Sequence, residues 1–295
     1  MDARAMSLRY PAPAKLNLFL HVVGRRADGY HLLQTVFRFV DLCDWIAIEV
    51  RDDGRIERSN ALEGVPDNED LVIRAAKLLQ EASGVKKGAR IAVDKHIPMG
   101  GGLGGGSSDA ATTLLALNEL WDTGLDREVL ADLGLKLGAD VPVFVRGFNA
   151  WAEGIGEQLQ PISLPPAWYV LIHPGVSVPT AQIFASPELT RTTNPLKIAP
   201  FSAGLNWAET RNDLEPVVCD KFPQVAQALR WLKSHGDARM SGSGACVFVA
   251  FDSEAEARSV AQRIPSEWRG FVVQGLDRHP LQFDESVRMG SRQAG

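Results

Sequence analysis

Apolar and polar positions alternate between Ala14 and Val23, the pattern of a β-strand with one face against a core. Even-numbered positions from 14 to 22 carry alanine, leucine or valine, whereas odd-numbered positions carry Lys15, Asn17, Phe19 and His21. The alternation predicts a half-buried strand. It also places Lys15 and Asn17 on the same face, two residues apart.

Hydrophobic periodicity and turn residues assign the rest of the chain. Strands are predicted over residues 31–40, 45–50, 90–94, 141–145, 150–153, 168–173, 245–251 and 270–274. Helices are predicted over residues 71–82, 110–121, 126–137, 180–184, 222–234 and 254–263. The tripeptide Asp52-Asp53-Gly54 predicts a hairpin after the strand 45–50.

A proline-dense segment, residues 161–166, marks the best place to divide the chain. We expect one domain over residues 1–163 and a second over residues 164–295, since 295 residues suffice for two ordinary cores. Strands and helices occur in both halves. The fold class is therefore predicted to be mixed α and β in two domains.

Composition and charge narrow the class of protein. Hydrophobic residues at 45% and charged residues at 23% are typical of a soluble globular protein. The net charge of −5 argues against a nucleic-acid partner bound through bulk charge. Three scattered cysteines suggest reduced thiols, and no apolar run approaches the length that spans a membrane. We expect a cytoplasmic protein without a membrane partner; the sequence leaves its oligomeric state open.

The most informative segment is a glycine-rich loop before the predicted helix 110–121. It consists of Pro98, Met99, Gly100, Gly101, Gly102, Leu103, Gly104, Gly105, Gly106, Ser107 and Ser108. Glycine costs chain entropy, so such a run indicates close backbone approach or positive φ. Successive N–H groups at a helix N-terminus bind anions, and Ser107 or Ser108 could cap the helix. We interpret the loop as a phosphate cradle.

Three other interpretations fit the loop less well. A flexible linker is disfavoured because strand and helix patterns flank the loop closely. A Walker loop fits Gly101 to Gly106, but Ser107 stands where that motif needs lysine. A dinucleotide fingerprint lacks its context, a strand that leads straight into the turn of an N-terminal strand-helix-strand unit.

Four further groups have both an ordinary and a functional interpretation. Lys15 is either a solvated lysine or a charge that acts on a nearby hydroxyl. Asp140, in a turn before the predicted strand 141–145, is either a turn cap or a general base for an acceptor hydroxyl. The turn Ser241–Gly244 either enters a hairpin or closes over phosphates. Tyr30 and His31 suit a planar base, although such a pair is commonly surface or core.

In combination these segments resemble the GHMP family of small-molecule kinases. The resemblance covers residues 11 to 275, and the loop is its most specific part. The segments that carry it are Pro13–Leu18, Asp28–His31, Pro98–Ser108, Gly138–Phe144, Pro174–Val176 with Thr180, and Met240–Phe248.

The resemblance implies an α+β fold of two domains with the active site between them. The segments are most similar to the branch that phosphorylates the 2-hydroxyl of 4-diphosphocytidyl-2-C-methyl-D-erythritol in non-mevalonate isoprenoid synthesis. The resemblance also implies that ATP binds the glycine-rich loop together with Mg²⁺, whose ligands stay unassigned. Asp140 would take the hydroxyl proton, and Lys15 would keep Asp140 ionised.

The resemblance also implies roles on the side of the substrate. Asn17 would orient the acceptor, and Thr180 would lie beside the diphosphate of a cytidine diphosphate substrate. Tyr30 and Phe184 would stack on either side of the cytosine, with His31 hydrogen-bonded to its edge.

The chain departs from the family pattern at one place, where Asp70-Leu71 stands instead of Asn-Leu at the adenine pocket. Asp lacks the amide donor, so Leu71 is retained only as a packing contact for ATP.

Competing functions are another GHMP kinase, acting on mevalonate, homoserine or a sugar, and a catalytically silent nucleotide-binding protein. The substrates of those other kinases carry no base that could stack on Tyr30 and Phe184. A silent nucleotide-binding protein predicts loss of Lys15 or Asp140, and both residues are present. A protein kinase is disfavoured because the sequence has neither His-Arg-Asp nor Asp-Phe-Gly.

Overall fold

The computed structural model describes residues 8–61, 66, 69–197 and 209–281. Within them ten strands form one sheet and eight helices pack around it. The strands are β1 (Leu8–Arg25), β2 (His31–Arg51), β3 (Ile56–Arg58), β4 (Gly88–Asp94), β5 (Ala150–Glu153), β6 (Gln158–Pro161), β7 (Trp168–His173), β8 (Arg239–Met240), β9 (Val247–Phe251) and β10 (Arg269–Leu276). The helices are α1 (Leu71–Ser83), α2 (Gly105–Leu120), α3 (Arg127–Leu135), α4 (Val141–Arg146), α5 (Thr180–Phe184), α6 (Glu215–Lys221), α7 (Pro223–Lys233) and α8 (Glu254–Ala261).

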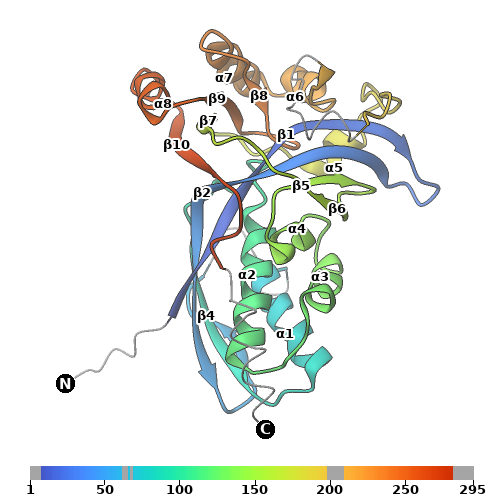
Figure 1. Cartoon of the computed structure of the whole chain (residues 1–295), viewed down its shortest axis with the longest axis vertical. Helices are drawn as coiled ribbons and strands as arrows, with labels where there is room; N and C mark the ends of the chain where they lie inside the picture. The colour runs from blue at the N-terminus through green and yellow to red at the C-terminus, as the bar shows by residue number, and fades with distance from the viewer. Residues whose placement is uncertain (1–7, 62–65, 67–68, 198–208, 282–295) are drawn as a thin grey trace.

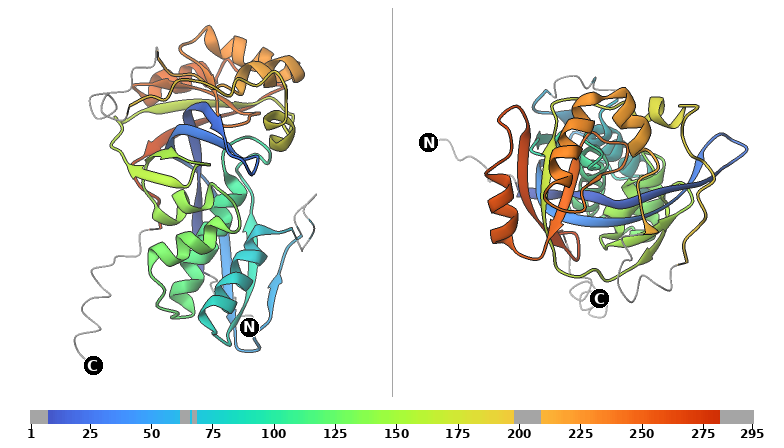
Figure 2. Two further views of the ribbon diagram at one scale, coloured as in Figure 1. Left: turned by 90° about the vertical axis from the view of Figure 1, so that its right-hand side faces the viewer. Right: turned by 90° about the horizontal axis from the view of Figure 1, so that it is seen from above.

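Two long antiparallel strands, β1 and β2, connect the two halves of the molecule (Figures 1 and 2). Helices α1 to α4 gather at one end of these strands, and α6 to α8 cover the sheet at the other. The sheet follows the order β3-β4-β2-β10-β7-β9-β8, with β1 and β5 also paired to β2, and β6 to β5. Strand β10 pairs with both β2 and β7, so hydrogen bonds run across both halves. The division at residues 163 and 164 stays a prediction.

The structure corrects the expectation that the first strand is half-buried. Both faces of β1 are covered, and even Lys15 and Asn17 are only 3% exposed. The polar face is covered because the glycine-rich loop and the turn 241–244 lie against it. The predicted strands 31–40 and 45–50 prove to be one strand, β2, with 21 residues.

Two predicted elements near turns are wrong. Residues 141–145 form helix α4 and not a strand. Pro142 in the first turn and Gly147 at the C-terminal cap, with φ of +75°, are helix boundary signals that outweigh the β-branched valines. The turn at residues 52–54 does not close a hairpin, because β3 pairs in parallel with β4 and not with β2.

Helix boundaries follow the capping residues where a side chain can reach the backbone. The Asp70 side chain accepts hydrogen bonds from the N–H groups of residues 72 and 73 at the start of α1, and Gly84 ends that helix with φ of +70°. Asp126 caps α3 in the same way. The expectation for α2 is wrong: Gly104 is the N-cap, and no side chain caps the helix.

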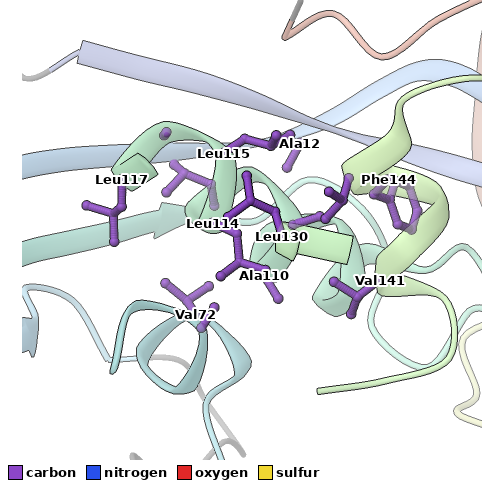
Figure 3. Close-up of a cluster of buried hydrophobic side chains, with 14 of the residues drawn as sticks. Ala12, Val72, Ala110, Leu114, Leu115, Leu117, Leu130, Val141 and Phe144 are labelled. Atoms are coloured by element: carbon purple, nitrogen blue, oxygen red, sulfur yellow. The ribbon is translucent and has the colours of Figure 1, made fainter. Parts of the chain in front are cut away.

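The hydrophobic core near the helical end is built around α2 (Figure 3). Ala110 and Leu114 of α2 lie between Val72 of α1 and the side chains of Val141 and Phe144 of α4. A second core lies under α6 to α8 and includes Leu20 and Val22 of β1, and a third lies between them. The loop before α2 is anchored in the third core by Ile97 and Leu103.

Candidate active site

The conformation of the glycine-rich loop requires glycine. Gly100, Gly102 and Gly104 have φ of +65°, +73° and +72°. A Cβ atom on Gly102 would lie 2.1 Å from the carbonyl oxygen of Ser241, and one on Gly100 would lie 2.1 Å from Ser177 Oγ. Positive φ and lack of space therefore act together at these positions.

The carbonyl groups of the loop are held by segments distant in sequence. Each oxygen accepts a hydrogen bond that keeps it turned toward the protein: Gly100 O from Ala245 N (3.1 Å), Gly101 O from Cys246 N (3.1 Å), and Gly102 O from Ser241 Oγ (3.0 Å). In contrast, no group among the described residues accepts a hydrogen bond from the backbone N–H groups of residues 100–107. A row of free N–H groups before the N-terminus of the 16-residue helix α2 is an anion site.

Lys15 joins this loop to Asp140. Its Nζ donates to Asn17 Oδ1 (2.5 Å) and to the carbonyl oxygen of Gly102 (3.1 Å), and it lies 3.2 Å from Asp140 Oδ2. The lysine side chain is 4% exposed, whereas that of Asp140 is 32% exposed. A buried ammonium is tolerated because oxygens surround it. Asp140 stays open to a ligand.

Asn17 is fixed from three directions. Its backbone N–H donates to Ser241 Oγ (3.1 Å), its Nδ2 donates to Thr35 Oγ1 (2.9 Å), and its Oδ1 accepts from Lys15. The network leaves the amide one orientation. Asn17 therefore positions Lys15 as well as facing the cavity.

A cavity of about 640 Å³ lies over these groups. It is lined by residues from both halves of the chain, among them Lys15, Asn17, Leu71, residues 98–107, Asp140, Thr180, Phe184 and Ser243. Its volume suits one or two small molecules of nucleotide size. Free N–H groups, a buried cation and an accessible carboxylate at one cavity are the parts that phosphoryl transfer requires.

Comparison with known proteins identifies the fold family. The family model "GHMP kinases N terminal domain" matches residues 70–148, and the model "GHMP kinases C terminal" matches residues 199–270. The chain belongs to the GHMP kinase family. It is a small-molecule kinase with an α+β fold, as the resemblance implied.

Full-length relatives refine the position of the chain within the family. It is 62% identical over 276 residues to the 4-diphosphocytidyl-2-C-methyl-D-erythritol kinase of Thiobacillus denitrificans, covering 94% of this chain and 98% of the relative. The enzyme of that name from Halorhodospira halophila is 56% identical, with coverage of 95% and 98%.

Solved structures agree with this position. A crystal structure of 4-(cytidine 5'-diphospho)-2C-methyl-D-erythritol kinase superposes with a TM-score of 0.79 at 36% identity, covering 91% of this chain and 99% of that one. Homoserine kinase from Cytophaga hutchinsonii shares the fold, with a TM-score of 0.67 at 17% identity and coverage of 95% and 97%. None of the described helices is long and apolar enough to cross a membrane.

The structure brings most of the predicted GHMP kinase residues together, with three exceptions. The side chain of Ser108 is fully buried and is not part of the cavity wall. Tyr30 lies 61% exposed on the hairpin between β1 and β2, outside the cavity lining. His31 also lies outside it, but its ring contacts that of Phe184 with centroids 5.1 Å apart. His31, which contacts the cavity-lining Phe184, thus stands at the rim, and Tyr30 precedes it in the chain on the exposed hairpin.

The turn Ser241–Gly244 is tied by hydrogen bonds to Thr180 at the cavity and to Asn212. Ser243 is hydrogen-bonded to Thr180 through their hydroxyl oxygens (2.7 Å). Asn212 holds the turn by donating to the carbonyl oxygens of Met240 (2.9 Å) and Gly242 (2.7 Å). No local sequence signal predicted Asn212, since its partners lie almost thirty residues away.

The Asp70 carboxylate at the start of α1 has a bonding partner for each of its oxygens. Asp70 Oδ2 accepts a hydrogen bond from Arg58 Nη1 at 2.6 Å, and both side chains are 6% exposed. Asp70 Oδ1 is occupied by the N-cap bonds. Arg58 therefore neutralises the Asp70 carboxylate at the cavity wall.

A buried ion cluster that the sequence analysis missed lies beneath the loop. Lys95 Nζ bonds to Asp44 Oδ2 and to Asp109 Oδ2, the latter at 2.7 Å. Two carboxylates thus share one ammonium. Burial raises the pKa of Asp109 to about 7, and Asp44 acts in the same direction while Lys95 opposes both. The Asp109 Oδ1 atom has no partner among the described residues.

The space at Gly102 gives a test of the loop. Gly102→Ala should lower the free energy of unfolding by about 3 kcal/mol and abolish measurable ATP binding, because positive φ and the Ser241 carbonyl both oppose a Cβ. Urea denaturation and titration calorimetry measure the two effects. Gly84→Ala is the matched control: φ is +70° there, but no atom lies within 4 Å of the new Cβ, so we expect a loss of about 1 kcal/mol and normal ATP binding. Equal effects of the two variants would contradict the close contact.

The ion cluster predicts a pH-dependent stability. Folded Asp109 keeps its proton to about pH 7, whereas the unfolded chain releases it near the ordinary value of 3.8. Stability of the wild type should therefore fall as the pH rises from 4 to 7. Asp109→Asn should remove that loss. Its free energy of unfolding should exceed that of the wild type by on the order of 2–4 kcal/mol at pH 8 and should differ little at pH 4.

Urea denaturation across this pH range measures the difference, with the exposed Asp132→Asn of α3 as the control. A difference in the free energy of unfolding between Asp109→Asn and wild type that stays constant with pH would refute the raised pKa of Asp109.

Proposed function

We propose that the cavity carries out ATP-dependent phosphorylation of the 2-hydroxyl of 4-diphosphocytidyl-2-C-methyl-D-erythritol, giving the 2-phosphate and ADP. The chain acts in the non-mevalonate synthesis of isoprenoid precursors. The observation that carries the residue assignment is the 3.2 Å pair of Lys15 Nζ and Asp140 Oδ2, placed between free loop N–H groups and a half-open cavity.

Asp140 is the proposed general base. Its carboxylate takes the proton of the 2-hydroxyl while that oxygen attacks the γ-phosphorus of ATP. The new oxygen–phosphorus bond forms as the bond between the γ-phosphorus and the β,γ-bridging oxygen breaks, and ADP leaves. The Lys15 ammonium pairs with the Asp140 carboxylate and attracts the hydroxyl oxygen as its negative charge grows.

The glycine-rich loop is the proposed phosphate site. The N–H groups of residues 100–107 and the N-terminus of α2 would stabilise the negative charge of the transferring group. Leu71 at the start of α1 would pack against the adenine. The carbonyl bonds that hold the loop mean that these donors need little reorganisation during the reaction.

Mg²⁺ fits the site as a companion of ATP rather than as a resident ion. Among the described residues no three His, Cys, Asp or Glu side chains cluster as a metal site. Mg²⁺ commonly keeps water and phosphate ligands with one or two protein oxygens, and the Ser107 hydroxyl and the Asp140 carboxylate both line the cavity. When bound, Mg²⁺ would neutralise phosphate charge.

The rim of the cavity is the proposed site of the cytidine diphosphate portion of the substrate. Phe184 lines the cavity and Tyr30 is exposed at the nearby hairpin, so the two rings are proposed to stack on the cytosine. His31, against Phe184, would hydrogen-bond the base, and Thr180 would lie by the diphosphate. Asn17 would orient the acceptor hydroxyl. The three cysteines are unpaired, as suits the cytoplasmic location that we propose.

Removing the base tests the mechanism. Asp140→Asn keeps the shape of the side chain but cannot accept the proton, so kcat should fall by about 100-fold or more while ATP affinity changes little. Steady-state kinetics and ATP titration measure the two, with Asp132→Asn as the control. Near-normal kcat in Asp140→Asn would remove Asp140 from the role of base.

The choice of acceptor tests the function itself. ADP release should require the cytidine substrate and should stay at background with mevalonate, homoserine or galactose, because those molecules carry no base for the rim. A coupled assay with ATP and Mg²⁺ compares the four acceptors at equal concentration. Turnover with another acceptor would retain the phosphate loop and discard the roles of Tyr30, His31 and Phe184.

A further inference from the structure

Arg191 links the two parts of the rim. Its Nε donates to His31 Nε2 at 3.0 Å, although the residues are 160 positions apart. The remaining nitrogens of its guanidinium donate to the carbonyl oxygens of Leu189 (3.0 Å), Phe184 (3.1 Å) and Ser186 (2.7 Å). Arg191 thus ties the start of β2 to the segment that follows α5.

The direction of the bond to His31 is unambiguous. A guanidinium has only donors, so His31 Nε2 must carry a lone pair, and the ring proton must be on Nδ1. Burial lowers the pKa of His31, and the charges of Arg191 and Arg25 lower it further. The ring therefore stays neutral. No described residue supplies a partner for Nδ1.

We propose that Arg191 is a positioning residue for substrate recognition: it fixes His31 in the Nδ1–H tautomer, against Phe184, so that the ring presents a single hydrogen-bond donor to the base of the substrate. The inference rests on the proposed function for its ligand. Both cytosine and uracil accept a hydrogen bond at O2, but N3 is an acceptor in cytosine and carries a proton in uracil. A fixed His31 donor directed at N3 therefore favours cytosine over uracil.

The tautomer can be measured without any substrate. Two-bond ¹H–¹⁵N correlation spectra of the full chain should show His31 with a protonated Nδ1 and an unprotonated Nε2 at pH 7. Arg191→Met should convert His31 to mixed tautomers and raise its titration midpoint. Arg25→Met is the matched control, because it removes a nearby charge without touching Nε2, and it should leave the Nδ1–H tautomer in place.

Kinetics test the consequence for the substrate. Arg191→Met should raise the KM for the cytidine substrate about tenfold, the effect of one lost hydrogen bond, with kcat and the KM for ATP within about twofold of wild type. The preference in kcat/KM for the cytidine substrate over its uridine counterpart should shrink. Arg191→Lys, which keeps the charge but not the planar fork, should not restore it.

The spectra and the kinetics can each overturn the proposed role of Arg191. An Nε2–H tautomer in the wild type, or an unchanged tautomer in Arg191→Met, overturns the proposal, as does full rescue by Arg191→Lys. An equal fall in kcat with both nucleotides would indicate a structural role for Arg191 and also overturn it. Absence of turnover by the wild type with the cytidine substrate would refute the proposed function, whereas the spectroscopic result would still test the tautomer.

Discussion

One carbonyl oxygen, that of Gly102, couples the parts of this active site. It accepts hydrogen bonds from Ser241 Oγ in the C-terminal half and from Lys15 Nζ on β1. Because a peptide unit is planar, holding this oxygen also sets the direction of the next N–H group, at Leu103. The direction of a proposed phosphate donor, the place of the lysine and the contact between the two halves therefore depend on the same interaction.

Lys15 and Asp140, the proposed catalytic pair, are unequal in burial, and the inequality suits the chemistry proposed for them. Lys15 is almost fully buried and bonded to oxygens on all sides, so its charge has one position. Asp140 is a third exposed at the start of α4, where a ligand can reach it. A base must exchange its proton with substrate and then with solvent, whereas a cation that stabilises charge gains from being held still.

The sequence predicted what lies within one segment and missed what joins segments. The glycine run and the strand face of Lys15 follow from local physics. Residues 141–145 failed because a short apolar run suits a buried helix as well as a strand. The Asp44, Lys95 and Asp109 cluster could not be foreseen, since its members come from three separate segments whose approach depends on the fold.

The two sides of the cavity differ in how far they are formed before a ligand binds. The phosphate side is made of backbone groups fixed by buried hydrogen bonds, and it is anchored by Leu103 in a core shared with both halves. The proposed acceptor side consists of Tyr30 and Thr180, which are exposed, and Phe184, which is half-buried. Energy from binding the base can therefore order the rim, whereas the phosphate site needs little ordering. On the proposed function, discrimination among acceptors would depend on the exposed rim, and the rate of transfer would depend on the buried network around Lys15.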